Sequence, residues 1–126
     1  MSAADTVADF IAAIERKDVP AAADLVTDDI VYHNMPMNPI VGREMVASTL
    51  EMFLSPASEV EWRILNQMVE GNTVMNERLD RFRVGDGWAE LPVAGVFEVV
   101  DGRISSWRDY FDMNVYTTQM AELTGG

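Results

Sequence analysis

The hydrophobic positions in the first part of the chain follow the 3.6-residue period of helices that bury one face. An apolar stripe at i, i+3, i+4 and i+7 over residues 7–14 predicts a first helix, with Ser2 or Asp5 as its cap. A cap residue followed by Val-Pro predicts a second, short helix over 18–26. A third amphipathic stripe predicts a helix over 42–55, which ends before the next proline.

In the second part of the chain, apolar and polar residues alternate with the period of two that is typical of β-strands. Glycine-containing turns separate the alternating runs, which predicts an antiparallel meander. A shorter run predicts a strand over 30–34, two prolines predict a loop over 35–39, and residues 114–123 predict a closing helix. The meander strands are expected at about 59–69, 73–84, 88–100 and 103–112.

This order of elements indicates an α+β fold, because helices come first and a long sheet follows. A long sheet that carries helices on one face twists, and it can curl into a cone around a pocket. Gly95 lies on the apolar face of its strand, where it marks either a bend or a place at which the pocket needs room. We therefore expect one domain over 1–126, with a strongly curved mixed or antiparallel sheet and three to four helices at the N- and C-terminal ends.

The charge and the rare residues exclude several classes of function. A net charge of −12 disfavours nucleic acid and anionic membranes as partners, since both attract basic patches. The absence of cysteine excludes disulfides and thiolate chemistry, and a single histidine, His33, excludes zinc sites built from several histidines. We expect no cofactor and no metal. With neither a signal-peptide pattern nor an apolar run of about 20 residues, the sequence predicts a cytoplasmic protein.

Strand alternation places a set of polar residues on faces that should point into the core. The even positions of 73–84 and of 30–34 are the inward ones, whereas His33 points the other way. In the last strand a carboxylate lies between large apolar residues, and burying it is costly unless it is paired or takes part in chemistry. The predicted inward polar residues are Tyr32, Asn34, Arg78, Asp80 and Asp109.

Two carboxyl groups and one guanidinium form an arrangement suited to general acid–base catalysis. Burial and a nearby like charge both raise a carboxyl pKa, so one acid can stay protonated beside a base. Tyr32 and Asn34 add groups that can hold a water or a substrate oxygen. The alternative interpretation is structural, with Arg78 and Asp80 as a buried ion pair and Asp109 as a turn cap.

Apolar residues on the same faces supply the candidate wall of a pocket. The odd positions of strand 88–100 are apolar throughout, and methionines suit irregular apolar cavities. For the aromatic residues taken singly, packing in the core is the simpler interpretation. The candidate substrate-binding residues are Met35, Phe53, Phe82, Leu91, Val93, Trp107 and Phe111.

Several short motifs, in their order along the chain, resemble the limonene epoxide hydrolase family, which has the SnoaL/NTF2-like, cone-shaped fold. Each motif is weak singly, and the set is specific in combination from about Asp28 to Met113. The motifs are Tyr32-His33-Asn34-Met35-Pro36, Gly42-Arg43, Glu77-Arg78-Leu79-Asp80, Gly95-Val96-Phe97 and Trp107-Arg108-Asp109-Tyr110-Phe111-Asp112.

This resemblance implies an epoxide hydrolase that adds water in one step, without a covalent intermediate, to give a vicinal diol. It implies Asp109 as general base, Asp80 as general acid and Arg78 as the bridge between them. Tyr32 and Asn34 would hold the attacking water. The apolar wall then implies a terpene-like or cyclic epoxide as substrate, and the family implies a homodimer.

Two other functions remain open at this point. One is an isomerase or cyclase, ketosteroid-isomerase-like or polyketide-cyclase-like, in which Asp109 or Asp80 moves a proton and Tyr32 is the oxyanion donor. An arginine between two aspartates disfavours it, because an enolate site needs neutral donors around one base. The other is a non-catalytic module that binds a small molecule. An intact acid and base disfavour that function.

Overall fold

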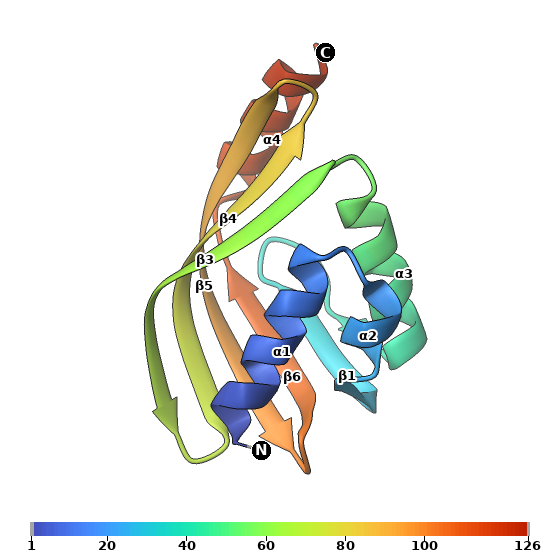
Figure 1. The fold of residues 1–126 in the computed structure, drawn as a ribbon, viewed down its shortest axis with the longest axis vertical. Coiled ribbons are helices and arrows are strands. Elements are labelled where there is room, and N and C mark those ends of the chain that lie inside the picture. The colour runs from blue at the N-terminus through green and yellow to red at the C-terminus, as the bar shows by residue number, and fades with distance from the viewer. Residues whose placement is uncertain (1, 126) are drawn as a thin grey trace.

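The structure is a computed structural model and describes residues 2–125. Within this range it contains four helices and one six-stranded sheet (Figure 1). The helices are α1 (Ala3–Glu15), α2 (Val19–Ala23), α3 (Arg43–Leu54) and α4 (Met113–Thr124). The strands are β1 (Val26–Asn34), β2 (Ile40–Val41), β3 (Glu59–Glu70), β4 (Thr73–Val84), β5 (Gly87–Val100) and β6 (Arg103–Tyr110).

The sheet is mixed, with the strand order β2-β1-β6-β5-β4-β3. Strands β3 to β6 pair with their sequence neighbours in antiparallel fashion, which confirms the predicted meander. Strand β1 adds to this meander in parallel to β6, with Tyr32 opposite Trp107 and Asn34 opposite Asp109. The sheet is curved, and α1 to α3 lie together on one side of it (Figure 1). This is the α+β fold with a curved mixed sheet that the sequence predicted.

The starts of α1 and α2 follow local capping chemistry. Ser2 caps α1 in a capping box, in which Ser2 accepts from the Asp5 backbone and the Asp5 side chain accepts from the Ser2 backbone. Asp18 caps α2 by accepting from the backbone N–H of Ala21. The predicted end of α2 at Val26 is wrong, because Val26 already pairs with β6 as the first residue of β1.

The other boundaries differ from the prediction by short segments. Polar residues 27–29 continue β1, so this strand is longer than the predicted 30–34. The two-residue strand β2 was not predicted, since it is too short for a periodic signal. Strand β6 ends at Tyr110 because Asp112 leaves the sheet to cap α4. The predicted third helix, the 35–39 loop and the closing helix are present.

The hydrophobic core lies between α1 and the inner face of the sheet. The apolar stripe of α1 is buried, and Phe10 packs edge-on against Trp107 with ring centroids 5.1 Å apart. Burial of a side chain of this size stabilises the fold by roughly 1.5–3 kcal/mol. Burial alternates along β4, which confirms that its even positions face inward. Among residues 2–125 no helix has the length and apolar character needed to cross a membrane.

Candidate active site

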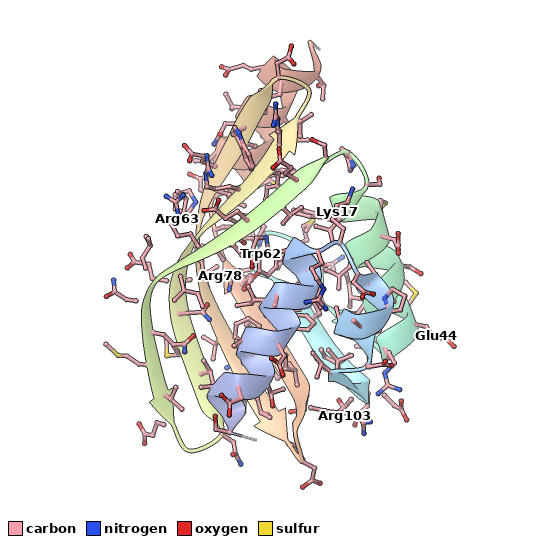
Figure 2. The ribbon with its side chains drawn as sticks, viewed as in Figure 1. Lys17, Glu44, Trp62, Arg63, Arg78 and Arg103 are labelled. Atoms are coloured by element: carbon pink, nitrogen blue, oxygen red, sulfur yellow. The ribbon has the colours of Figure 1, made fainter. Side chains whose placement is uncertain are left out.

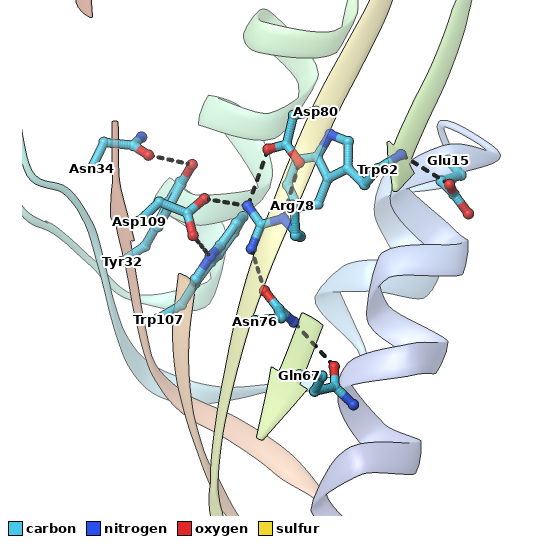
Figure 3. Close-up of polar contacts among 10 residues, drawn as sticks. All are labelled: Glu15, Tyr32, Asn34, Trp62, Gln67, Asn76, Arg78, Asp80, Trp107 and Asp109. Carbon is cyan, nitrogen blue, oxygen red and sulfur yellow. Dashed lines mark hydrogen bonds and ion pairs between the residues drawn. The ribbon is translucent and has the colours of Figure 1, made fainter. Parts of the chain in front are cut away.

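Polar side chains from three strands meet on the inner face of the sheet. They are Tyr32 and Asn34 from β1, Arg78 and Asp80 from β4, and Asp109 from β6, and each is at most 5% exposed. Figure 3 shows them directed toward one another. In Figure 2, Arg78 lies inside the molecule, whereas exposed arginines such as Arg63 project from its surface. Alternation along each strand therefore predicted the inward face of these residues correctly.

The guanidinium of Arg78 bridges the two carboxyl groups. Its Nε donates to Asp80 Oδ1 at 2.9 Å, and its Nη2 donates to Asp80 Oδ2 and to Asp109 Oδ2, both at 3.0 Å. Its Nη1 donates to Asn76 Oδ1 at 2.9 Å. Hydrogen bonds between ionised groups are short and directional, so the planar fork of Arg78 fixes both carboxyl groups relative to each other.

A second set of contacts orients Asp109. Trp107 donates from its indole Nε1 to Asp109 Oδ1 at 2.8 Å. The same indole stacks on Tyr32, with centroids 3.8 Å apart and an interplanar angle of 10°. The hydroxyl of Tyr32 then donates to Asn34 Oδ1 at 3.0 Å. One continuous network therefore runs from β1 through β6 to Arg78 on β4.

Burial and charge shift the protonation of this network. Burial raises the pKa of Asp80 from 3.8 to about 6, although the charge and hydrogen bonds of Arg78 act in the opposite direction. The charge of Asp109 also raises this pKa. Burial raises the pKa of Tyr32 far above its usual value, so its hydroxyl stays protonated. Asp80 is thus a carboxyl group that carries a proton near pH 6.

A small cavity adjoins the two carboxyl groups. The space that a water-sized sphere can occupy there is about 10 Å³, which corresponds to about one water molecule. Of the predicted substrate-binding residues, Phe53, Phe82, Leu91, Val93 and Phe111 line it. Within residues 2–125, no group of three or more His, Cys, Asp and Glu side chains could hold a metal ion.

Two predicted substrate-binding residues lie elsewhere. Trp107 is fully buried behind Tyr32 and holds Asp109 instead of lining the cavity. Met35 follows β1, where its backbone N–H donates to the backbone oxygen of Asp109 at 2.9 Å, and its side chain is not part of the cavity wall.

Comparison with known families identifies the family of this chain. Residues 1–121 match the limonene-1,2-epoxide hydrolase catalytic domain. The chain belongs to the limonene epoxide hydrolase family. It is therefore an enzyme of the epoxide hydrolase class.

Individual relatives agree with this family assignment. The chain is 35% identical over 104 residues to epoxide hydrolase EphG of Mycobacterium tuberculosis (strain ATCC 25618 / H37Rv), a match that covers 82% of this chain and 69% of that protein. It superimposes on an LEH-like epoxide hydrolase of M. tuberculosis with a TM-score of 0.81 and 30% identity, over 98% of this chain and 96% of that one.

A more distant solved structure supports the fold alone. An NTF2-like protein of unknown function from Cytophaga hutchinsonii matches with a TM-score of 0.78 and 20% identity, over 93% of this chain and 96% of that chain. The chain therefore has the NTF2-like fold that the sequence predicted.

In this family member, sequence reasoning missed two residues of the site. Asn76 accepts from Arg78, and it lies on the even, inward face of β4. Trp62 on β3 lines the cavity and is only 5% exposed. Strand alternation could have identified both residues. Asn76 is an even position of β4, and Val60 and Trp62 are alternate apolar positions of β3.

Proposed function

We propose that this epoxide hydrolase adds water to an apolar, terpene-like or cyclic epoxide and gives a vicinal diol in one step, without a covalent intermediate. The observation that carries this proposal is the position of Arg78 Nη2, 3.0 Å from one oxygen of Asp80 and 3.0 Å from one oxygen of Asp109. Both carboxyl groups also line the cavity. An acid and a base held at fixed separation are what concerted epoxide opening requires.

Asp109 is the general base in this mechanism. Arg78 and Trp107 donate to its two oxygens, which hold the carboxylate in a fixed orientation. The Tyr32 hydroxyl donates to Asn34 Oδ1, so the Asn34 amide nitrogen can donate to a water in the cavity. Asp109 takes one proton from this water as the water oxygen bonds to an epoxide carbon. Proximity supplies a large part of the rate, since water and base are already in place.

Asp80 is the general acid. Its pKa is raised to about 6, so a useful fraction of the enzyme carries the proton near that pH. As the carbon–oxygen bond of the epoxide breaks, its electron pair goes to the oxygen and the Asp80 proton follows. Asp109 is then protonated and Asp80 is ionised. Return of one proton from Asp109 to Asp80 restores the starting state.

An apolar substrate fits the walls of the cavity. The side chains opposite the carboxyl groups are aromatic or aliphatic, and they offer no charged group to a substrate. The cavity of about 10 Å³ has room for a water molecule and not for an epoxide, so substrate entry requires wall side chains to move. Phe53 is the half-buried wall residue on α3, and it stacks on Tyr116 of α4. We propose that this pair moves aside to admit the substrate.

We also propose a homodimer formed through the outer face of the sheet. Met68 on β3 and Met75 on β4 are cross-strand partners on that face and are 77% and 51% exposed. Leu65 nearby is 53% exposed. Exposed apolar side chains that gather on one sheet face are typical of an interface between protein chains.

The experiment that tests the proposed function is a diol-formation assay with limonene, cyclohexene and styrene oxides. Wild type is compared with Asp80→Asn and Asp109→Asn, and acid–base assistance of about 10²–10⁴-fold should be lost in each variant. Asp112→Asn is the matched control. Asp112 belongs to the same motif, is exposed and caps α4, a role that asparagine also fulfils, so its rate should equal that of wild type.

The outcomes separate the candidate functions. Absence of diol from every epoxide would contradict the proposal, and a steroid enone would then test the isomerase alternative. Near-full turnover by Asp80→Asn or Asp109→Asn would contradict the assigned roles while leaving the activity established.

A further inference from the structure

Trp62 carries a buried hydrogen-bond donor that nothing in the described structure uses. Among residues 2–125 no group accepts from its indole Nε1–H, and the residue is only 5% exposed. Buried polar groups in folded proteins nearly always have a partner. Because Trp62 also lines the active-site cavity, this donor is available to a molecule bound there.

The position of Trp62 places this donor beside the general acid. Trp62 on β3 and Asp80 on β4 are direct partners in the antiparallel pair, and both line the same cavity. Figure 3 shows the indole ring next to the Asp80 carboxyl group. The guanidinium of Arg78 lies over the ring, with Cζ 4.6 Å from the centroid, a favourable cation–π contact that holds the ring plane.

The neighbouring donors already have partners. The three guanidinium nitrogens of Arg78 donate to Asp80, Asp109 and Asn76. The other indole of the site, that of Trp107, donates to Asp109. The Asn34 amide nitrogen is assigned to the attacking water beside Asp109. The donor left for the epoxide oxygen beside Asp80 is therefore the N–H of Trp62.

We propose that Trp62 is a further catalytic residue, whose Nε1–H donates to the epoxide oxygen while Asp80 delivers its proton to the same oxygen. This role rests on the proposed epoxide hydrolysis. As the water oxygen bonds to carbon, the carbon–oxygen bond breaks and its electrons move to the oxygen. Trp62 keeps its own proton, and its N–H stabilises the negative charge that develops on the oxygen.

Trp62→Phe tests this role, because it removes the N–H and keeps an aromatic ring for Arg78. We expect kcat to fall by about 10²-fold, the usual effect of losing one donor to a developing oxyanion. The matched control is Trp88→Phe. Trp88 also has an arginine over its ring, with Arg81 Cζ at 4.3 Å, but it lies on the opposite face of the sheet. Its kcat should be that of wild type.

A substrate comparison separates this role from a structural one. An electron-withdrawing substituent on the epoxide makes the departing oxygen less basic, so this oxygen needs less stabilisation. The loss caused by Trp62→Phe should therefore be smaller for such an epoxide than for the parent compound. A purely structural effect would lower both rates by the same factor.

Each outcome decides the proposal. Wild-type kcat in Trp62→Phe, or an equal loss for both substrates, would overturn the role of Trp62. Absence of diol from the wild type would contradict the epoxide hydrolysis itself. This outcome is distinct from a failure of the Trp62 role, in which the wild type still forms diol. If circular dichroism shows that Trp62→Phe does not fold, 3-benzothienylalanine at position 62 takes its place in both comparisons, because it replaces the N–H with sulfur and keeps the ring shape.

Discussion

Gly95 on β5 leaves the space that the guanidinium of Arg78 on β4 occupies. A Cβ at position 95 would overlap Arg78 Nη1, and it would lie 2.8 Å from Asp109 Oδ1 and 3.3 Å from Asn76 Oδ1. The sequence offered two reasons for this glycine, a bend in the strand or space for the pocket. The structure supports the second, because the Arg78 side chain fills the space beside Gly95. The Arg78 bridge between the two carboxyl groups thus requires a residue without a side chain at position 95 on the neighbouring strand.

We expect Gly95→Ala to displace Arg78 and to lower kcat/KM by about 10²-fold or more, since misplacement of a catalytic group by about 1 Å has effects of that size. Overpacking should also lower the free energy of unfolding by about 1–3 kcal/mol. Steady-state kinetics and urea unfolding measure the two effects. Ala94→Ser, whose side chain points to the other face, is the control. Wild-type kinetics in Gly95→Ala would show that Arg78 does not need its present position.

The rate should depend on the protonation of Asp80. Its pKa is raised to about 6 by burial, and a general acid works only when protonated, so kcat/KM should fall as the pH rises through about 6. Glu15 contributes to this raised pKa, so Glu15→Gln should move the fall to lower pH. Glutamine keeps an acceptor for the Trp62 backbone. Both effects are measured by recording kcat/KM against pH for wild type and Glu15→Gln, with Glu51→Gln at an exposed position as the control. A wild-type kcat/KM that does not change with pH would exclude Asp80 as the acid.

The source of the diol oxygen distinguishes the one-step mechanism from a covalent one. A single turnover in ¹⁸O-labelled water, with enzyme in excess over epoxide, should place the label in the diol and none in the protein. Mass spectrometry of the diol and of peptides containing Asp80 and Asp109 measures both. Label in either carboxyl group would indicate an ester intermediate and would contradict direct attack by water.

The substrate range should respond to Phe53. This residue packs edge-on against Phe82 at 5.4 Å and stacks on Tyr116 at 5.3 Å, so Phe53→Ala opens the cavity toward α4. We expect kcat/KM for limonene oxide to rise relative to cyclohexene oxide by about tenfold, the scale of pocket-size discrimination. Met52→Ala, 72% exposed on the same helix, is the control. An unchanged preference would mean that Phe53 does not limit the size of the substrate.

The proposed homodimer predicts that wild type has twice the monomer mass of 14.0 kDa by light scattering after gel filtration. The double variant Met68→Glu, Met75→Glu should be monomeric, because it places carboxylates in the proposed apolar interface, where burying them without a partner is costly. Met52→Glu makes the same chemical change at a residue on α3 and should remain dimeric. A monomeric wild type would contradict the dimer.

Local alternation in the sequence decided which residues point inward. Arg78 and Asp80 are two residues apart on β4, and a strand turns both side chains to one face whatever it pairs with. The same reasoning placed Asp109 inside and His33 on the other face of β1. The sequence also predicted the cap Asp18 and offered Ser2 as one of two candidate caps of the first helix, since a cap uses only residues within one turn.

The tertiary structure alone decided which inward residues meet. Strand β1 pairs in parallel with β6, and this places Asn34 beside Asp109 although the two are far apart in the sequence. No periodic pattern encodes that pairing, because it results from packing of the whole sheet against α1 and not from the geometry of one strand. The same applies to Trp62, which lies opposite Asp80 only through the register of β3 on β4. Thus the sequence determined the chemical groups and their faces, and long-range strand pairing assembled them into one site.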